Sequence, residues 1–423
     1  FKNASEMDFD AEIQKDAFLN YAKLSYDIGN PYKSSSEVLQ AYVDKYPNSA
    51  ETTYIEKLIV SAYLQFKDYQ GAIDYYNQHR LVKDAVYQTI LIEKGFELYN
   101  QRKYKEANQF FSEASGIYAD HGLKYRALFW EGETLSEMND FIGAAYAFQS
   151  FVRDEDSQYL DEYNDGIYGL AYALYQQKKY ENAIKVFQDY ITATNNDVKR
   201  RNAILRIADC HYVSKDYWPA LEKYNQIISE NKEQVDYAMY QKALGYGFLG
   251  RNEKKVETLK LLQATFKRSA YLDNSYYQLG NLYVNQNKNN LAIAAYDDLI
   301  IKYPKSPLAA KAKLKKGTVL FNTNKYEASI NVLKELVQEY AGTAEAIQAV
   351  GIVEQVYKEL DQVDVYAEWV KELEFVNITD ADIDKTMFEA AQNKYISNDL
   401  GGAISSCKKY LLNFPNGIHS LTV

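Results

Sequence analysis

The sequence has 423 residues, a formal net charge of −10, and few of the residues that interrupt helices: 19 glycines and 6 prolines. Both residues are scarcer than in average proteins, which excludes an all-β sandwich or barrel, because such folds need a turn about every 8–12 residues. The hydrophobic content of 47% excludes a disordered chain, the 2 cysteines exclude a disulfide scaffold, and the negative charge opposes binding to nucleic acid.

Taken in chain order, the sequence predicts a series of helix pairs that repeats about every 37 residues. Each pair has an anchor position, usually aromatic, that we expect to open its second helix. The anchors are Tyr32, Tyr69, Tyr104, Phe141, Tyr180, Tyr217, Asn252, Asn289, Tyr326, Gln362 and Leu400. They predict an all-α solenoid of about eleven pairs, or about 22 helices, in which each pair packs on its neighbours.

Small and large residues recur at fixed distances from the anchors. Three residues after the anchor stand Ala72, Ala107, Ala144, Ala183, Ala220, Ala292, Ala403, Ser35 and Ser329. Nine residues before it stand Gly95, Gly132, Ala171, Ala208, Ala243, Gly280, Gly317 and Ala391. Small side chains let two crossing helices approach, so that large residues interdigitate beside them. We expect the core to hold the residues seven positions after each anchor: Leu39, Tyr76, Phe111, Phe148, Phe187, Tyr224, Leu259, Tyr296, Leu333, Trp369 and Cys407.

The predicted pairs follow one another without a linker, so we expect one continuous solenoid over residues 1–423. In chain order the units span roughly residues 10–47, 48–83, 84–120, 121–156, 157–195, 196–231, 232–268, 269–305, 306–341, 342–377 and 378–415. Residues 416–423 look like the start of a further unit. The sequence is therefore expected to be part of a longer array.

One unit carries the spacing of the tetratricopeptide signature most clearly, in the residues Tyr276, Leu279, Gly280, Tyr283, Ala292, Tyr296 and Pro304. On these residues the sequence resembles the tetratricopeptide repeat (TPR) family. The resemblance implies a TPR-like α-α superhelical solenoid that binds proteins or peptides on its concave face, without enzymatic activity.

Short strings in the turns carry a second resemblance. The strings that begin at Tyr46, Tyr303 and Phe414 all continue with proline, and they are similar to those of envelope TPR proteins. Such proteins include outer-membrane assembly lipoproteins, Tol–Pal-associated periplasmic proteins and long TPR proteins of Bacteroidetes-type bacteria. This resemblance implies a periplasmic or outer-membrane-associated location, and a cytoplasmic location stays open. Because no stretch of about 18 apolar residues predicts a membrane span, membrane association would come only through parts outside this chain.

Motifs that could carry chemistry are weak in this sequence. Residues 245–250 match G-x-G-x-x-G, but the motif falls at the end of a predicted helix, whereas dinucleotide binding needs a preceding strand. Lys255, where a small residue belongs, makes the same unit the most deviant, and we expect a flexible joint there. Asp380, Asp382 and Asp384 resemble the opening of a calcium loop without its glycine and glutamate, and they suit the first turn of a helix. We therefore predict no catalytic residues, no cofactor and no metal site.

A candidate partner-binding stripe lies on the first helix of each pair, at five, eight and twelve residues before the anchor. Its aromatic members are Phe96, Tyr99, Tyr168, Tyr172, Tyr175, Tyr212, Tyr240, Tyr277, Phe321, Tyr357 and Tyr395. Tyrosine suits a protein interface because it offers a large, stiff contact surface with a polar tip. The alternative is that these rings pack between successive first helices and only stabilise the array.

Two functions are consistent with this pattern. The first is an interaction scaffold that holds peptide segments or protein partners on its concave face, with the bacterial cell envelope as the location that the resemblance implies. The second is a structural spacer arm of a longer envelope protein whose active module lies outside this chain. Nucleic acid is not an expected partner, because the basic clusters at residues 199–201 and 311–316 stand in an acidic chain. Binding of acidic tails would need a basic cradle, and the stripe offers only scattered basic residues.

Overall fold

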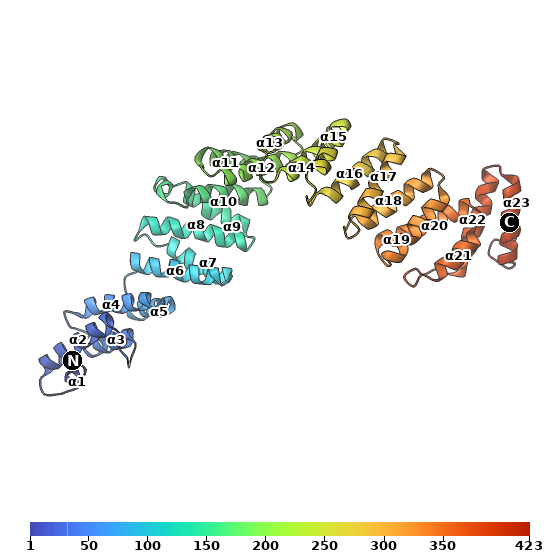
Figure 1. The fold of residues 1–423 in the computed structure, drawn as a ribbon. Helices are drawn as coiled ribbons and strands as arrows, with labels where there is room; N and C mark the ends of the chain where they lie inside the picture. Colours follow the sequence, from blue (N-terminus) through green and yellow to red (C-terminus); the bar gives the residue numbers. More distant parts are fainter. Residues whose placement is uncertain (32) are drawn as a thin grey trace. The chain divides into compact units, whose positions relative to one another are not determined.

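A computed structural model describes residues 1–31 and 33–423, and over these residues the regular structure is entirely helical (Figure 1). After the short α1 (Lys2–Ser5), the helices follow in pairs joined by tight turns. Their bounds are α2 (Ala11–Asp27), α3 (Ser35–Lys45), α4 (Thr52–Gln65), α5 (Tyr69–His79), α6 (Ala85–Asn100), α7 (Tyr104–Ser115), α8 (His121–Glu137), α9 (Phe141–Val152), α10 (Tyr163–Gln176), α11 (Tyr180–Ala193), α12 (Asp197–Val213), α13 (Tyr217–Glu230), α14 (Val235–Phe248), α15 (Asn252–Thr265), α16 (Leu272–Asn285), α17 (Asn289–Lys302), α18 (Ala309–Asn322), α19 (Tyr326–Glu339), α20 (Ala344–Glu359), α21 (Val363–Lys371), α22 (Asp380–Ile396) and α23 (Leu400–Asn413). A 3-10 helix, η1 (Glu155–Tyr159), stands between α9 and α10. The predicted all-α fold of repeated helix pairs is confirmed.

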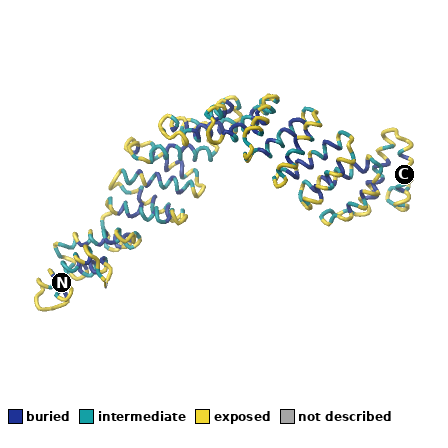
Figure 2. The backbone as a smooth tube through the Cα atoms, viewed as in Figure 1, coloured by how far each residue is buried: buried dark blue, intermediate teal, exposed yellow. Residues whose placement is uncertain are grey.

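The helices form two compact units, Phe1–Asp216 and Tyr217–Val423. Within the first unit, each helix from α6 to α11 packs on the one before and the one after it, and α16 to α20 do the same in the second. Figure 2 shows the buried residues of each unit along the helix faces that meet neighbouring helices, with the exposed residues gathered in the turns and at outer faces. The boundary falls in the turn between α12 and α13, and continuity of the solenoid across it stays a prediction.

The predicted anchors coincide with helix starts. Nine of them are the first residue of a second helix: Tyr69, Tyr104, Phe141, Tyr180, Tyr217, Asn252, Asn289, Tyr326 and Leu400. Gln362 precedes α21 by one residue, and Tyr32 lies outside the described residues. The period read from the sequence therefore locates these helices to within one residue.

A left-handed backbone residue stands two positions before each of these helix starts and turns the chain from the first helix into the second. These residues are Lys67, Arg102, Asn139, Lys178, Lys215, Gly250, Asn287, Asn324, Asp361 and Asn398, with φ between 50° and 70°. Gly250 is the last glycine of the G-x-G-x-x-G string, which thus ends α14 and opens the turn to α15. The motif is explained by turn geometry, because glycine adopts this conformation without strain.

The core follows the predicted schedule with two exceptions. The small residues three positions after the anchors are buried, and so are the large residues seven positions after nine of them. Trp369 and Cys407 were expected in the core, but both are only half-buried. For Trp369 the reason is register: α21 begins at Val363, and the seventh residue after that start is Val370, which is 1% exposed. Cys407 lines an open groove over α22 and α23.

The lysine at the position of a small residue has a local explanation. Lys255 replaces the small residue in its unit, and a Cβ added to Gly247 would lie 3.1 Å from the Cδ atom of Lys255. Gly247 thus makes room for the lysine stem, while Lys255 Nζ donates a hydrogen bond of 2.9 Å to Oε1 of Gln278. Both α14 and α15 are regular helices. The flexible joint expected in this unit stays a prediction.

The acidic string at the start of α22 works as predicted for a helix N-terminus. Thr379 and Asp382 form a reciprocal capping box. Asp384 is buried and accepts hydrogen bonds from the Tyr410 hydroxyl (2.6 Å) and from the backbone N–H of Ile418 (2.8 Å). These carboxylates are used within the fold, and a calcium-loop arrangement is not formed by them.

Candidate interaction groove on the first helices

The predicted stripe is largely built into the helix stack. Tyr240 and Tyr357 are buried, Tyr395 is 68% exposed, and the other eight rings are half-buried. The half-buried members are Phe96, Tyr99, Tyr168, Tyr172, Tyr175, Tyr212, Tyr277 and Phe321. Partial burial leaves part of each ring open to a partner, so the stripe divides its surface between the stack and the solvent.

Ring contacts show what the buried part of the stripe does. Phe96 and Tyr99 on α6 meet Trp130 of α8 edge-on, with centroid distances of 4.9 and 5.4 Å. Tyr168 on α10 meets Phe187 and Tyr190 of α11 at 5.6 and 5.3 Å. Edge-to-face pairs at such distances are favourable beyond the area that they bury. Phe96 and Tyr99 thus pack between successive first helices, whereas Tyr168 packs against the second helix of its own pair. Whether these rings also bind a partner stays a prediction.

Further stripe residues also contact neighbouring aromatic rings, in both units. Tyr172 stacks with Tyr175 at 6.2 Å within α10, and Tyr175 meets Tyr180 at the start of α11. In the second unit, members of the stripe pair with rings that come later in the chain: Tyr240 with Tyr271, Tyr277 with Tyr296, Phe321 with Tyr326 and Tyr357 with Tyr366.

A groove of about 610 Å³ lies over three successive first helices of the first unit, α8, α10 and α12. We call it the first-helix groove. Its lining residues are Phe129, Trp130, Glu133, Ser136, Glu137, Glu162, Asp165, Tyr168, Gly169, Tyr172, Lys199 and Asn202. Of the predicted residues, the groove brings together Tyr168 and Tyr172. Gly169 lies directly against Phe148 of α9, since a Cβ at that position would lie 2.6 Å from Cζ of that ring.

The groove combines aromatic faces with an excess of carboxylates. Asp165 is paired with Lys199 (2.5 Å), and Glu162 with Arg126 (2.8 Å), which stands beside the groove. Among the described residues, Glu133 and Glu137 have no ion pair or hydrogen bond of this kind. Burial, together with the charges of Asp165 and Glu137, raises the pKa of Glu133 to about 7, and Lys199 opposes this shift.

Sequence reasoning missed the polar half of this site, although the signal was present. Phe129, Glu133 and Ser136 stand twelve, eight and five residues before the anchor Phe141, which are the stripe positions. All three line the groove. Restricting the stripe to aromatic residues left out Glu133 and Ser136, whereas reading every residue at those positions would have found them. Phe129 is aromatic and fits the pattern, but it was omitted from the stripe.

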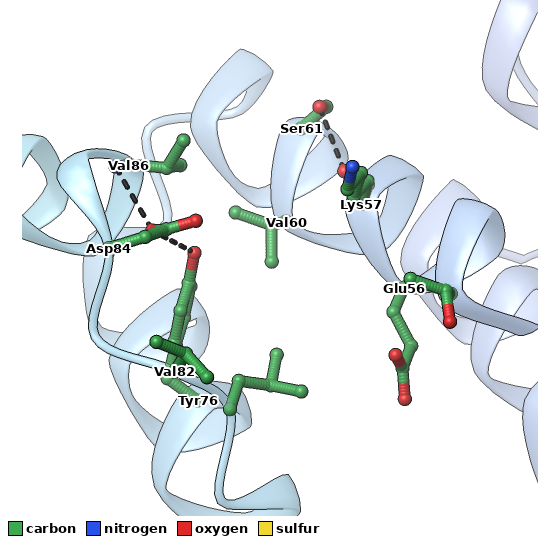
Figure 3. Close-up of a pocket in the computed structure, with 10 residues that line it drawn as sticks. Glu56, Lys57, Val60, Ser61, Tyr76, Val82, Asp84 and Val86 are labelled. Atoms are coloured by element: carbon green, nitrogen blue, oxygen red, sulfur yellow. Dashed lines mark hydrogen bonds between the residues drawn. The ribbon is translucent and has the colours of Figure 1, made fainter.

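Two other grooves lie outside this surface. One, of about 510 Å³, is bordered by α4, α5 and α6 and is mainly apolar, with Val60, Val82 and Val86 around it (Figure 3). At its edge the Tyr76 hydroxyl donates a hydrogen bond of 3.1 Å to Asp84, which also caps α6 (Figure 3). The other, of about 630 Å³ over α22 and α23, contains the exposed Tyr395.

The described residues contain no group of three or more histidine, cysteine, aspartate or glutamate side chains placed to hold a metal ion. None of the helices described is both long and apolar enough to cross a bilayer.

Comparisons with known proteins agree with the repeat. Residues 277–344 and 165–192 each match a model described as a tetratricopeptide repeat. The comparison with curated proteins gives no significant match. Among solved structures, the chain is similar to the C-terminal part of a TPR repeat-containing protein from Cytophaga hutchinsonii (14% identity, TM-score 0.45, covering 60% of this chain and 97% of that one).

Two further structures show similarity of the same order. A tetratricopeptide repeat protein from Parabacteroides merdae is 14% identical, with a TM-score of 0.41, over 63% of this chain and 98% of that one. The apo form of RapI is 15% identical, with a TM-score of 0.47, over 93% and 95% of the two chains. Helix pairs of the predicted period, together with the two matched segments, lead to one conclusion: this chain contains tetratricopeptide repeats.

Proposed function

We propose that this protein is a non-enzymatic scaffold that holds a peptide segment of a partner protein in the first-helix groove. The observation that carries the proposal is the groove itself, about 610 Å³ in volume and lined by residues of three successive first helices. A volume of this order accommodates a ligand of several residues, and aromatic walls with a few polar groups are typical of binding sites. Helical repeats present such extended surfaces to their partners.

We further propose a location in a bacterial cell envelope, periplasmic or outer-membrane-associated. The support is the resemblance of the turn strings that begin at Tyr46, Tyr303 and Phe414 to those of envelope TPR proteins. Fractionation of the native cells, with detection of the protein in the periplasmic and membrane fractions, tests the location. Recovery in the cytoplasm alone would contradict it.

The groove is tested by photo-crosslinking in the native cell. Benzoylphenylalanine replaces Tyr172, which lines the groove, and in a control variant it replaces Tyr146, an exposed tyrosine on the second helix α9. We expect a defined set of partner proteins to be crosslinked from position 172 and absent from position 146. The same products from both positions, or none from 172, would argue against the groove.

A structural spacer arm is the second candidate. Its support is the extent to which the stripe rings contact other rings within the helix stack, as Phe96 and Tyr99 contact Trp130. A spacer would yield no partner-specific crosslinks from position 172, so the same experiment separates the two functions.

A further inference from the structure

We propose that the first-helix groove selects partner segments that carry a cationic side chain, lysine or arginine, and binds that side chain between Glu133, Glu137 and the aromatic wall. The inference rests on the proposed scaffold function and adds the chemical class of the partner. The charge balance and the aromatic faces of the groove support it, and a buried acceptor at its edge adds to them.

The charge balance of the groove favours a cation. Three basic residues lie in or beside it, and each is paired with its own carboxylate: Lys199 with Asp165, Arg126 with Glu162, and Arg206 with Asp209 at 2.9 Å. Glu133 and Glu137 are the surplus, and they stand four residues apart on one face of α8. When both carboxyl groups are ionised, like charges at this spacing repel each other, and a cation placed between them removes the repulsion.

The aromatic wall suits the same occupant. Trp130, Tyr168 and Tyr172 line the groove together with the two glutamates. A guanidinium or ammonium group over an aromatic face is attracted by the negative charge of the ring face, and more strongly where water is partly excluded. Arginine gains most, because its planar group can stack on a ring while it donates hydrogen bonds to a carboxylate.

A third observation calls for a hydrogen-bond donor. The Oδ1 atom of Asn202, at the α12 side of the groove, is buried and accepts no hydrogen bond from the described residues. Buried acceptors normally have a partner. As placed, this oxygen is closed off from the groove, and a partner's N–H would reach it only after the Asn202 side chain turns. The carboxylates and the ring faces therefore carry the preference for a ligand rich in positively charged donors, and Asn202 would add an acceptor once it turns.

The test uses the full chain and short fluorescent peptides in a glycine–serine–alanine background. One peptide carries two arginines four residues apart, and the matched peptide carries citrulline, which keeps the shape and loses the charge. Fluorescence anisotropy is measured at about pH 8 and about 50 mM salt, where screening is weak. The groove variant is Glu133→Gln with Glu137→Gln, and the control variant is Glu106→Gln with Glu181→Gln, two exposed residues on α7 and α11. Both double variants change the net charge equally.

We expect wild-type protein to bind the arginine peptide at least about ten-fold more tightly than the citrulline peptide, and the groove variant to lose this preference. The control variant should keep it, which separates the groove from the general attraction of an acidic protein. Tyr172→Leu should weaken the arginine peptide more than the citrulline peptide. Circular dichroism confirms that each variant is folded.

Equal binding of the two peptides, absence of binding, or an equal loss in groove and control variants would overturn the selection of cationic segments. The scaffold function fails separately: it is judged by the crosslinks from position 172. Crosslinks without arginine preference would leave the scaffold in place and remove only the partner class.

Discussion

Gly132 of α8 lies directly against the ring of Phe148 of α9, so that a Cβ atom at Gly132 would lie 2.7 Å from Cε1 of that ring. Phe148 is completely buried, so its ring is enclosed by neighbouring side chains. Gly95 and Phe111 repeat this relationship in the preceding pair, with a distance of 2.6 Å. The glycine nine residues before the anchor thus has no side chain where the large residue seven positions after the anchor packs.

We predict that Gly132→Ala lowers the free energy of unfolding by about 1–3 kcal/mol, because the methyl group overpacks this contact. Alanine is the better helix former by about 1 kcal/mol, so the loss of stability from overpacking has to exceed this gain in helix propensity. The control is Gly351→Ala in α20, where a Cβ meets nothing within 4 Å. Thermal unfolding followed by circular dichroism should show a lower midpoint for the first variant and a slightly higher one for the second. A rise in both would mean that the core repacks freely.

The Gly132–Phe148 contact also shows why the sequence predicted the fold well and the site only in part. Sequence spacing alone identifies which residues face each other, because every helix pair repeats the same two positions, nine residues before the anchor and seven residues after it. It locates Phe148 and Gly132 on opposite sides of one crossing without any knowledge of neighbouring pairs. The first-helix groove, by contrast, depends on how Glu133, Asp165 and Lys199 on three different pairs come together. No single repeat contains that information, because the pair joins two successive units: Asp165 stands 15 residues before one anchor and Lys199 stands 18 residues before the next. Arg126 and Glu162 repeat this pairing one unit earlier, with the charges exchanged.

The turn residues give a prediction with opposite signs at two equivalent positions. Gly250 (φ 67°) and Lys178 (φ 62°) both adopt the left-handed conformation that starts the turn into a second helix. Gly250→Ala should destabilise by about 1 kcal/mol, because an L-residue is strained there and no contact compensates. Lys178→Gly should stabilise by about 0.5–1 kcal/mol, since relief of strain exceeds the entropy that glycine adds to the unfolded chain. Urea unfolding at fixed pH measures both. Shifts of the same sign would contradict this account.

The two cysteines should differ in reactivity. Cys210 is buried, and burial raises the pKa of its thiol to about 12. Cys407 is half-buried and lines the groove over α22 and α23. Since the thiolate is the reactive form, iodoacetamide at about pH 8 should modify Cys407 and leave Cys210 intact until the protein is unfolded. Peptide mass spectrometry of native and urea-unfolded samples checks this, and equal labelling of both in the native protein would refute it.

We predict that Glu133 makes the stability of the first unit depend on pH. Its pKa is raised from 4.5 to about 7, chiefly by burial, so the folded protein holds a proton there that the unfolded chain has already released. Stability falls with rising pH wherever the unfolded state binds fewer protons, which places the loss between about pH 4.5 and 7. Above this window the ionised carboxylate costs up to about 3 kcal/mol, and less where water reaches it.

Glu133→Gln should therefore raise the unfolding midpoint at about pH 8 and leave it nearly unchanged at about pH 5, where the wild-type side chain is largely protonated in the fold. Glu106→Gln, at an exposed position on α7, should alter the midpoint little at either pH. Thermal unfolding of the three proteins at several pH values measures the difference. If wild type and Glu133→Gln kept a constant separation across the range, the buried carboxyl would not be the source of the pH dependence. If instead the difference in unfolding midpoint grew with pH and then shrank when the arginine peptide was added, the ionised carboxylate of Glu133 would both destabilise the fold and attract the ligand.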